Sequence, residues 1–404
     1  MPEAITRLAL LGHSDFSMFG ALRNALLFDA VGRWSLQIVE TLGYSKIMDS
    51  STRSGIRFGQ PTVLNYRRET NALSPYAPQS QVGISGLINL HESLLGRTVS
   101  DCIQNATSSY KQLDVSDLNP PLLRRISHPG ASVAITLDAS HNLSDNRENR
   151  HGENSRHPDS PLNSGAPCDE SSLNEYQLVN AGILPTITSE SSHSFATLGL
   201  DLHSDLPPFL PVGGNEDRMY RSILSLCYRD RVEAHLPVVV CHGHPVPPND
   251  VSERRDITPS DIISQMISDF ASHAYILDAT HSLTQLGSYL SSIAHLSTRD
   301  FRSHVTRVSI IVLSTRMRRI LQNPPTPSNN RSGVASEIRR QVDDLRIRIE
   351  QIGRTGSVEI SSAFDMDLLQ LQRLIGNWGA LLFNWPHLLT TAREMRARGI
   401  RPAV

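Results

Sequence analysis

Lysine is almost missing from this chain of 404 residues. Lys46 and Lys111 are the only two, so arginine supplies 36 of the 38 basic side chains. Schiff-base chemistry and phosphate binding by a loop lysine are therefore nearly excluded. A GC-rich genome produces the same bias without selection on the protein. In either case arginine offers a flat, weakly hydrated guanidinium group that suits protein interfaces and pairing with carboxylates.

Cysteine, aromatic residues and long apolar runs are also scarce. The four cysteines are scattered without a Cys-x-x-Cys spacing, which excludes a disulfide framework and a cysteine-based zinc site. No run approaches the ~20 apolar residues that a membrane-spanning helix needs, and the first residues lack a secretory leader. The net charge of −2 gives no general attraction to nucleic acid. We therefore expect a soluble intracellular protein that is neither secreted nor bound to membranes.

Common catalytic and cofactor motifs are absent as well. The sequence has no G-x-G-x-x-G, no phosphate-binding glycine loop that ends in Lys-Ser/Thr, and no G-x-S-x-G nucleophile turn. The segment Gly83-Ile-Ser-Gly86 has the wrong spacing for that turn. We expect no cofactor and no enzymatic activity.

One segment of the chain occurs twice. Residues Ala131–Ser144 read ASVAITLDASHNLS and residues Ala271–Thr284 read ASHAYILDATHSLT, with eight identities in fourteen positions at a separation of 140 residues. A duplicated supersecondary unit is the best explanation. We predict that the two copies adopt superimposable backbones in equivalent surroundings.

Each copy contains an aspartate followed three residues later by a histidine. Asp138 with His141, and Asp278 with His281, have the spacing of a helix cap and the first helical turn. An aspartate that orients a histidine for acid–base catalysis is the alternative interpretation. We favour structural caps for both pairs because a duplicated unit repeats its architecture.

Apolar periodicity predicts a mainly α fold with a few short β-strands, of the α+β class, with an internally duplicated helical unit and long irregular loops. A helix is predicted from Ser17 to Leu42, and a buried strand from Pro237 to Cys241. Thr258, Pro259 and Asp261 form a strong helix start. The predicted regions are an N-terminal helical region (1–112), a first repeat unit with a polar insertion at 142–175 (113–252), and a second repeat unit with the C-terminal helices (253–404).

The most enzyme-like feature is His242-x-His244, which follows the predicted strand. Alternate strand residues point the same way, so both imidazoles would face one metal ion. A metal-dependent hydrolase that uses these two histidines is therefore an alternative function. The motif departs from the Asp-x-His-x-His of metal-dependent amidohydrolases, and two histidines in a proline-rich turn are more typical of a surface or an interface.

A second interface candidate lies near the C-terminus, where apolar residues recur at steps of four and three. These positions form either an intermolecular seam or a stripe that packs on its own domain. The arginine-rich tail lacks interleaved aromatics, so we expect it to be solvated or to contact protein. It is the only place where we consider contact with nucleic acid. The candidate interface residues are Ile338, Val342, Leu345, Ile349, Ile352, Arg393 and Arg396.

Taken together, these features resemble the structural proteins of double-stranded RNA viruses, namely the capsid, clamp or protrusion subunits. The resemblance rests on arginine in place of lysine, extended Pro/Ser/Asn-rich segments and internal duplication in a mainly helical chain, and no single motif carries it. It implies a homo-oligomer or a partner of a capsid shell protein, located in the virion or the host cytoplasm. A non-viral scaffold or adaptor is the other alternative.

Overall fold

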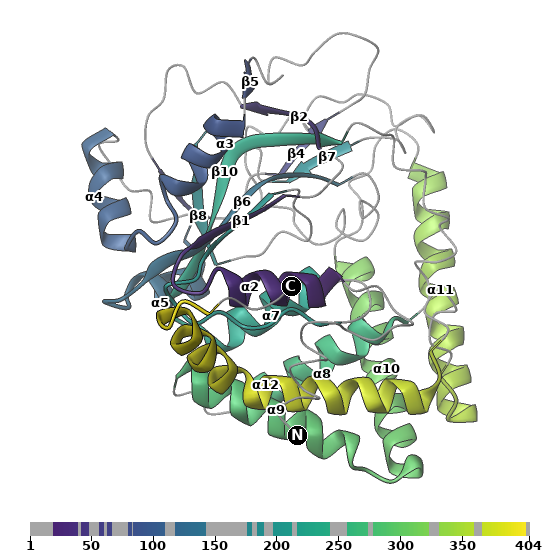
Figure 1. Cartoon of the computed structure of the whole chain (residues 1–404). Helices are drawn as coiled ribbons and strands as arrows, with labels where there is room; N and C mark the ends of the chain where they lie inside the picture. The colour runs from purple at the N-terminus through teal and green to yellow at the C-terminus, as the bar shows by residue number, and fades with distance from the viewer. Residues whose placement is uncertain are drawn as a thin grey trace.

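The structure is a computed structural model in which helices pack around a central sheet (Figure 1). It describes residues 19–38, 42–47, 56–59, 63–66, 80–82, 84–109, 118–142, 176–179, 184–189, 197–211, 216–242, 257–273, 278–322, 331–358 and 366–400.

The sheet is formed by β1 (Trp34–Ile38), β2 (Leu42–Ile47), β3 (Arg57–Phe58), β4 (Val63–Tyr66), β5 (Ser80–Val82), β6 (Ser132–Asn142), β7 (Tyr176–Val179), β8 (Thr186–Thr188), β9 (Thr197–Asp201) and β10 (Arg231–His242). Its main path runs β1-β9-β6-β10-β2-β5. The central strands β6 and β10 are parallel, and the other neighbours on this path are antiparallel. Off the path, β3 pairs with β8 and β4 pairs with β7, while β8 joins β10 and β7 joins β6.

The described helices are α2 (Phe19–Asp29), α3 (Ile84–Glu92), α4 (Val99–Ser109), α5 (Pro120–Ile126), α7 (Glu216–Cys227), α8 (Pro259–His273), α9 (Ala279–Ala294), α10 (Thr298–Gln322), α11 (Arg331–Thr355) and α12 (Leu368–Ala397). Together with the sheet they confirm the predicted mainly α fold of the α+β class. The predicted start of α8 is also confirmed, since the Thr258 hydroxyl accepts a hydrogen bond from the Asp261 N–H at 3.2 Å.

Two hydrophobic cores flank the sheet. Val232, Ala234 and Leu236 of β10 pack with residues of α3, α4 and α5. Ile135 and Leu137 of β6 join the larger core, which contains α2, α7 and the helices α8, α9, α10 and α12. Strand β6 serves both cores, since its Val133 lies in the smaller core and its Ala134 lies in the larger one. Figure 1 shows α2 and α7 between the sheet and the helices below it.

Strand β10 confirms the predicted strand at Pro237–Cys241 and extends it toward the N-terminus. Proline has no N–H to donate to a neighbouring strand, so it is tolerated in a central strand only where the pairing is interrupted. The register between β10 and β6 shifts between His235 and Val239, which is the interval that contains Pro237.

The prediction of one helix from Ser17 to Leu42 is wrong. Helix α2 ends at Asp29, Gly32 adopts a positive φ of 74°, and β1 follows. The apolar spacing of Trp34 and Ile38 fits a helical turn and equally fits alternate positions of a strand, and pairing with β9 decides between them. The region 1–112 is therefore not purely helical, because it also contains β1 to β5.

The two copies of the repeated segment do not share a backbone, so the predicted superposition is wrong. The first copy lies in β6, whereas the second forms the end of α8 and the beginning of α9. The second copy is followed by Leu283, Leu286 and Leu290, an apolar stripe that a helix can bury. The first copy is followed by a polar segment and instead gains strand partners in β9 and β10.

The sheet is built from the first two of the three predicted regions. Strands from residues 1–112 and from residues 113–252 share the one sheet, and residue 253 lies between its last strand and α8. Beyond Asn142, the polar insertion at 142–175 lies outside the described residues. The division into three regions stays a prediction.

Helices α9 and α12 pack side by side at glycine contacts (Figure 1). A Cβ atom on Gly287 would lie 2.5 Å from the backbone nitrogen of Phe383 and 2.6 Å from the carbonyl oxygen of Gly379. The close approach is possible because neither glycine carries a side chain. It brings the buried Trp378 and Trp385 into the larger core.

We predict that Gly287→Ala lowers the free energy of unfolding by about 1–3 kcal/mol, because the added methyl group meets backbone atoms that cannot move independently. Gly353→Ala is the matched control, since a Cβ there meets nothing within 4 Å. That change should raise the free energy of unfolding by roughly 0.5–1 kcal/mol through helix propensity. Urea unfolding of both variants measures these changes. Equal stabilisation by both substitutions would contradict the close contact of α9 with α12 at Gly287.

Candidate functional site

Asp278 is a helix cap, as predicted. Its carboxylate Oδ1 accepts a hydrogen bond from the His281 N–H at 2.8 Å, and α9 begins at the next residue, Ala279. The Ser282 hydroxyl donates to the Asp278 carbonyl oxygen at 2.6 Å. His281 therefore lies in the first turn of α9, and its backbone is what contacts Asp278.

Asp138 is not a helix cap, and this part of the prediction is wrong. It lies in β6 with its side chain fully buried, and its Oδ1 accepts a hydrogen bond from the Thr197 N–H of β9 at 2.9 Å. His141 pairs with Leu178 of β7 through the backbone, and its side chain lies outside the described residues. Asp138 therefore links two strands because the first copy of the repeat is extended.

A group of side chains that resembles a catalytic site lies next to Asp138, at the contact between α3 and the sheet. His91 Nδ1 lies 2.7 Å from Thr136 Oγ1, and its Nε2 lies 3.1 Å from Thr197 Oγ1. A histidine beside a hydroxyl is the arrangement that activates a nucleophile. Here, however, His91 is only 2% exposed and both threonines are fully buried. No substrate can reach the hydroxyls, so the group acts as a polar link within the fold.

Glycine at position 199 makes room for this link. A Cβ on Gly199 would lie 2.7 Å from His91 Nδ1 and 2.2 Å from Thr136 Oγ1. Burial lowers the pKa of His91 from 6.5 to about 4, so its imidazole is neutral near pH 7. A neutral ring can donate one hydrogen bond and accept another, as two hydroxyl partners require.

The side chains of His242 and His244 lie outside the described residues, although His242 ends β10. Within the described part of the chain, no three His, Cys, Asp or Glu side chains are grouped closely enough to hold a metal ion. No described helix is long and apolar enough to cross a membrane. The hydrolase interpretation stays a prediction.

The residues of the predicted seam lie on α11, which packs against α10. Ile352 is buried, and Val342, Leu345 and Ile349 are half-buried. The side chain of Ile338 lies outside the described residues. The seam is thus packed within the chain at Ile352, and its other described positions are half-buried.

The two arginines of the predicted C-terminal interface make contacts within the chain. Arg393 forms an ion pair with Asp205. Arg396 donates to the carbonyl oxygens of Asp29 and Val31 at 2.6 and 2.8 Å. Both side chains therefore fasten α12 to other segments of the same chain.

A buried charged group lies between α5, α7 and β10. Burial raises the pKa of Glu233, while the positive charges of Arg221 and Arg125 act in the opposite direction. Arg125 also donates to the carbonyl oxygen of Arg231 and, at 3.0 Å, to the Ser225 hydroxyl. It thereby ties α5 to the end of α7 and to the first residue of β10.

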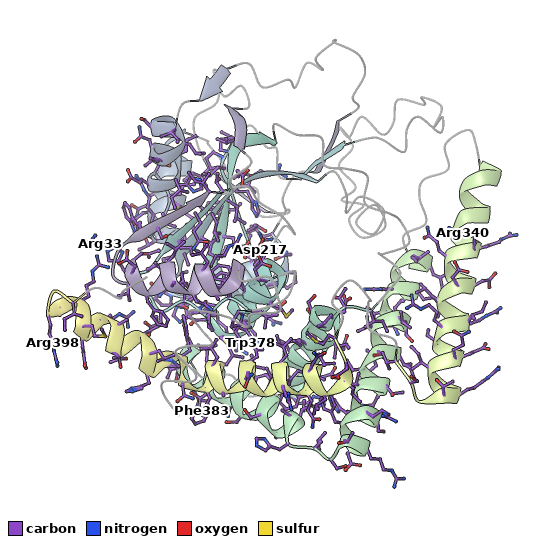
Figure 2. The ribbon with its side chains drawn as sticks, turned by 45° about the vertical axis from the view of Figure 1, so that its right-hand side comes forward. Arg33, Asp217, Arg340, Trp378, Phe383 and Arg398 are labelled. Carbon is purple, nitrogen blue, oxygen red and sulfur yellow. The ribbon has the colours of Figure 1, made fainter. Side chains whose placement is uncertain are left out.

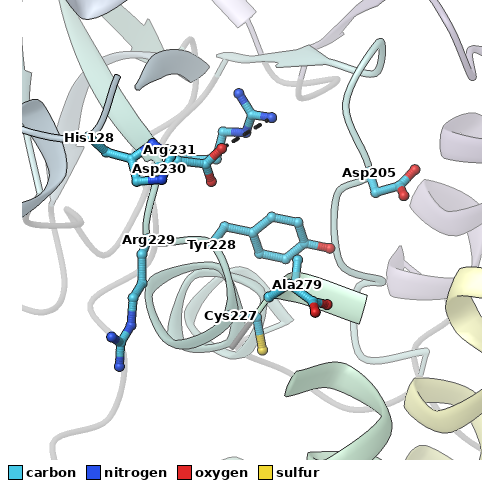
Figure 3. Close-up of a pocket in the computed structure, with 9 residues that line it drawn as sticks. His128, Asp205, Cys227, Tyr228, Arg229, Asp230, Arg231 and Ala279 are labelled. Carbon is cyan, nitrogen blue, oxygen red and sulfur yellow. Dashed lines mark ion pairs between the residues drawn. The ribbon is translucent and has the colours of Figure 1, made fainter. Parts of the chain in front are cut away.

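Next to Arg125 lies a cavity of about 330 Å³, shown in Figure 3. The turn from α7 into β10 supplies five of its residues, and the α5–β6 loop, the segment after β9 and the beginning of α9 supply the rest. The lining residues are His128, Asp205, Cys227, Tyr228, Arg229, Asp230, Arg231, Asp278 and Ala279.

Backbone hydrogen bonds hold the turn that forms one side of this cavity. The Tyr228 N–H donates to the Leu224 carbonyl oxygen at 2.9 Å, and the Ser132 N–H donates to that of Asp230 at 3.0 Å. The second bond joins the turn to the beginning of β6. Sequence reasoning selected Asp278 as a cap and missed the other lining residues, because they belong to no motif and come from four separate segments.

Comparison with known proteins finds no matching family model, no matching curated protein and no similar solved structure. Two features of the described geometry bear on function, namely the cavity beside Tyr228 and the hairpin of α10 and α11.

We predict that Asp278→Ala lowers the free energy of unfolding by about 1 kcal/mol, because the His281 N–H loses its acceptor. Asp278→Asn keeps a side-chain oxygen at the same place and should cost much less. Thermal unfolding of both variants measures the difference. Equal losses would show that the carboxylate charge matters and the cap does not.

His91 predicts a specific acid sensitivity. The pKa of His91 is about 4 in the folded chain and 6.5 ordinarily, so between these values the unfolded state binds more protons. Stability should therefore fall as the pH drops from 6.5 toward 4, and this histidine should account for about 3 kcal/mol of the loss.

Urea unfolding at a series of pH values tests this, with His91→Gln expected to flatten the pH dependence in that window. The exposed His273 is the matched control, and His273→Gln should leave the dependence unchanged. An unaltered slope in His91→Gln would contradict the assignment, whatever that substitution does to stability at pH 7.

Proposed function

We propose that this protein is a structural assembly subunit that associates with copies of itself through the hairpin of α10 and α11. The sequence resemblance suggests the particular form of this role, namely a capsid or capsid-decorating subunit. The observation that carries the proposal is an apolar stripe on the hairpin that is buried at one end and only half-covered toward the other, within the described residues.

The two helices of the hairpin run antiparallel. The Thr306 hydroxyl, near the beginning of α10, donates to the carbonyl oxygen of Gly356, just after α11, at 3.2 Å. At this end of the hairpin, Val305 and Val308 of α10 and Ile352 of α11 are buried in the larger core. Figure 1 shows α11 at the edge of the molecule, outside α10.

Apolar side chains continue along the hairpin beyond this buried end. On α10, Met317 and Ile320 are half-buried and Leu321 is 56% exposed. On α11, Val342 of the seam is half-buried. Within the described residues the coverage of apolar side chains thus declines toward the end of α10, and a partner that packs there would remove them from water.

The charges on α11 favour a second copy of the chain as this partner. Arginine and acidic residues alternate along the helix, and Arg340–Asp344, Arg346–Asp343 and Arg354–Glu350 pair at 3.2, 3.4 and 3.3 Å. With four acidic residues against six arginines, α11 offsets much of its own positive charge, which lowers the repulsion between two identical helices. Three of its arginines already pair with acidic neighbours, which weakens their attraction to nucleic acid. Figure 2 shows many side chains of α11, including Arg340, directed outward.

Two identical hairpins could bury this apolar stripe by pairing with two-fold symmetry, because each copy would cover the same patch of the other. The product would be a four-helix arrangement in which the half-buried stripe becomes an interior. Symmetric contacts of this kind can be repeated in a larger assembly.

Leu321→Asp should weaken self-association about tenfold or more, because a Leu side chain contributes roughly 1.5–3 kcal/mol when buried and a charge there is unfavourable. Light scattering of the full chain over a range of concentrations measures this. The wild type should exceed the monomer mass of 44.7 kDa, and the variant should shift toward it.

Ile84→Asp is the matched control, because Ile84 is also apolar and exposed (64%) but lies on α3. It should keep the wild-type mass. A wild type that is monomeric at every concentration, or equal effects of the two substitutions, would refute the proposal.

A further inference from the structure

Strand β1 forms one end of the sheet. Among the described strands its partner is β9, with which it pairs in antiparallel orientation from Trp34 to Ile38. Both end residues of β1 face water, since Trp34 is 46% exposed and Ile38 is 39% exposed. The edge of β1 that points away from β9, called the outer edge below, thus carries no strand among the described residues.

The pairing with β9 determines which backbone groups lie on the outer edge. The Leu202 N–H donates to the Arg33 carbonyl oxygen at 2.9 Å, so Arg33 directs this oxygen toward the chain that continues β9. In an antiparallel pair, successive residues direct their N–H and C=O groups alternately toward the partner strand and away from it. The backbone groups of Trp34, Leu36 and Ile38 therefore point to the outer edge.

The outer edge lacks the features by which sheet proteins prevent pairing with another chain. Those features are charged side chains, proline, bulges and very short strands. The sequence of β1, WSLQI, contains no charged residue and no proline, and its register with β9 continues without a shift. At the other end of the same path, β5 has only three residues. Of the two ends, β1 is the one suited to accept a further strand.

We infer that the outer edge of β1 pairs with the same edge of a second copy of this chain, in antiparallel orientation about a two-fold axis at Leu36. The three residues that point outward are evenly spaced about Leu36. In this register Leu36 meets its own copy, and Trp34 meets Ile38 of the partner subunit. Because each such pair exchanges two hydrogen bonds, the contact forms about six.

The side chains of β1 favour the same arrangement. Trp34, Leu36 and Ile38 share one face of the strand, as alternate residues do. The proposed register places the two exposed end residues beside each other twice, and an aromatic residue opposite a β-branched one stabilises a sheet. A strand without charge meets its own copy without repulsion, and it offers nothing for a charged partner to recognise. These properties favour a second copy as the occupant of the edge.

The contact at β1 is separate from the hairpin, and Figure 1 shows β1 within the sheet and α11 at the right-hand side of the molecule. The inference deepens the proposed assembly role and rests on it for its purpose, although the strand pairing itself does not require the hairpin. A subunit with two separate two-fold contacts can join a neighbour on each side. A five-residue edge is small for an interface, so this contact alone should be weak.

Crosslinking through Leu36→Cys tests the strand pairing. The chain also carries Leu321→Asp, so that the hairpin contact is weakened and any dimer reports on β1. Across the two-fold axis, the two Cα atoms of position 36 would lie about 5.5 Å apart, within reach of a short bismaleimide. We expect a covalent dimer on a denaturing gel at high protein concentration.

Ile84→Cys in the same Leu321→Asp chain is the matched control, because Ile84 is also apolar and exposed but lies on α3. The parent chain measures the background from the native cysteines, of which Cys102 and Cys227 are buried. Both should give little dimer. If Leu36→Cys gives no more dimer than Ile84→Cys, the inference is wrong, and an edge that accepts only a segment of another protein would give this same result.

A charge exchange tests the register. Trp34→Lys or Ile38→Glu, added singly to the Leu36→Cys chain, should lower the yield of dimer several-fold, because each places a charge beside an apolar side chain of the partner. Both substitutions together should restore much of the yield, since opposite charges then face each other.

Within one chain these two positions lie about 13 Å apart along the strand, so recovery requires a second copy. Recovery would also show that the single substitutions act on the contact and leave folding intact. A yield in the double variant no higher than in the single ones would overturn the inference. The hairpin is tested separately by the mass of the wild type against that of Leu321→Asp, so the two failures are distinguishable.

Discussion

The parallel pairing of β6 with β10 is the constraint on which the rest of the fold depends. Each strand is entered from a helix, β6 from α5 and β10 from α7, so the pairing also places two helix-to-strand turns side by side. Strand β6 supplies residues to both hydrophobic cores, and β10 supplies the smaller one. The cavity opens where the two strands begin, and its position follows from the register of this one pair.

Polar groups buried near this pair serve the architecture. His91 bonds two threonine hydroxyls, Asp138 accepts from a neighbouring strand, and Glu233 lies near two arginines. Buried polar groups are tolerable when each finds a partner, and they then hold strands and helices in one arrangement. Tyr228 differs, because its buried hydroxyl has no hydrogen-bond partner among the described residues.

Helix α12 contacts several distant segments of the chain, whereas α11 packs mainly against α10. The indole N–H of Trp385 donates to the Leu206 carbonyl oxygen at 2.7 Å, and its ring lies 4.8 Å from that of Phe28 on α2. Asp367 and Gln370 form a capping box at the beginning of the helix. Helix α11 packs against α10, and its Leu345, Ile349 and Ile352 join the larger core.

Local sequence was sufficient wherever the relevant interaction lies within a few residues. Thr258 and Asp278 were identified as caps because a cap bonds to an N–H three residues ahead, and the α10 and α11 stripes were visible from their spacing. The strand at Pro237–Cys241 was found from its run of β-branched residues. The cavity had no such signal, since Tyr228, Asp205 and Asp278 meet only after the chain has folded.

By itself the sequence determined the caps, the apolar stripes and the mainly helical, α+β character of the chain, because these depend on neighbours along the chain. Only the tertiary structure decided that one copy of the repeated segment is a strand and the other a helical turn. Identical side chains are compatible with both backbones, and partners from distant segments, β9 and β10 in one case and the helical core in the other, select between them.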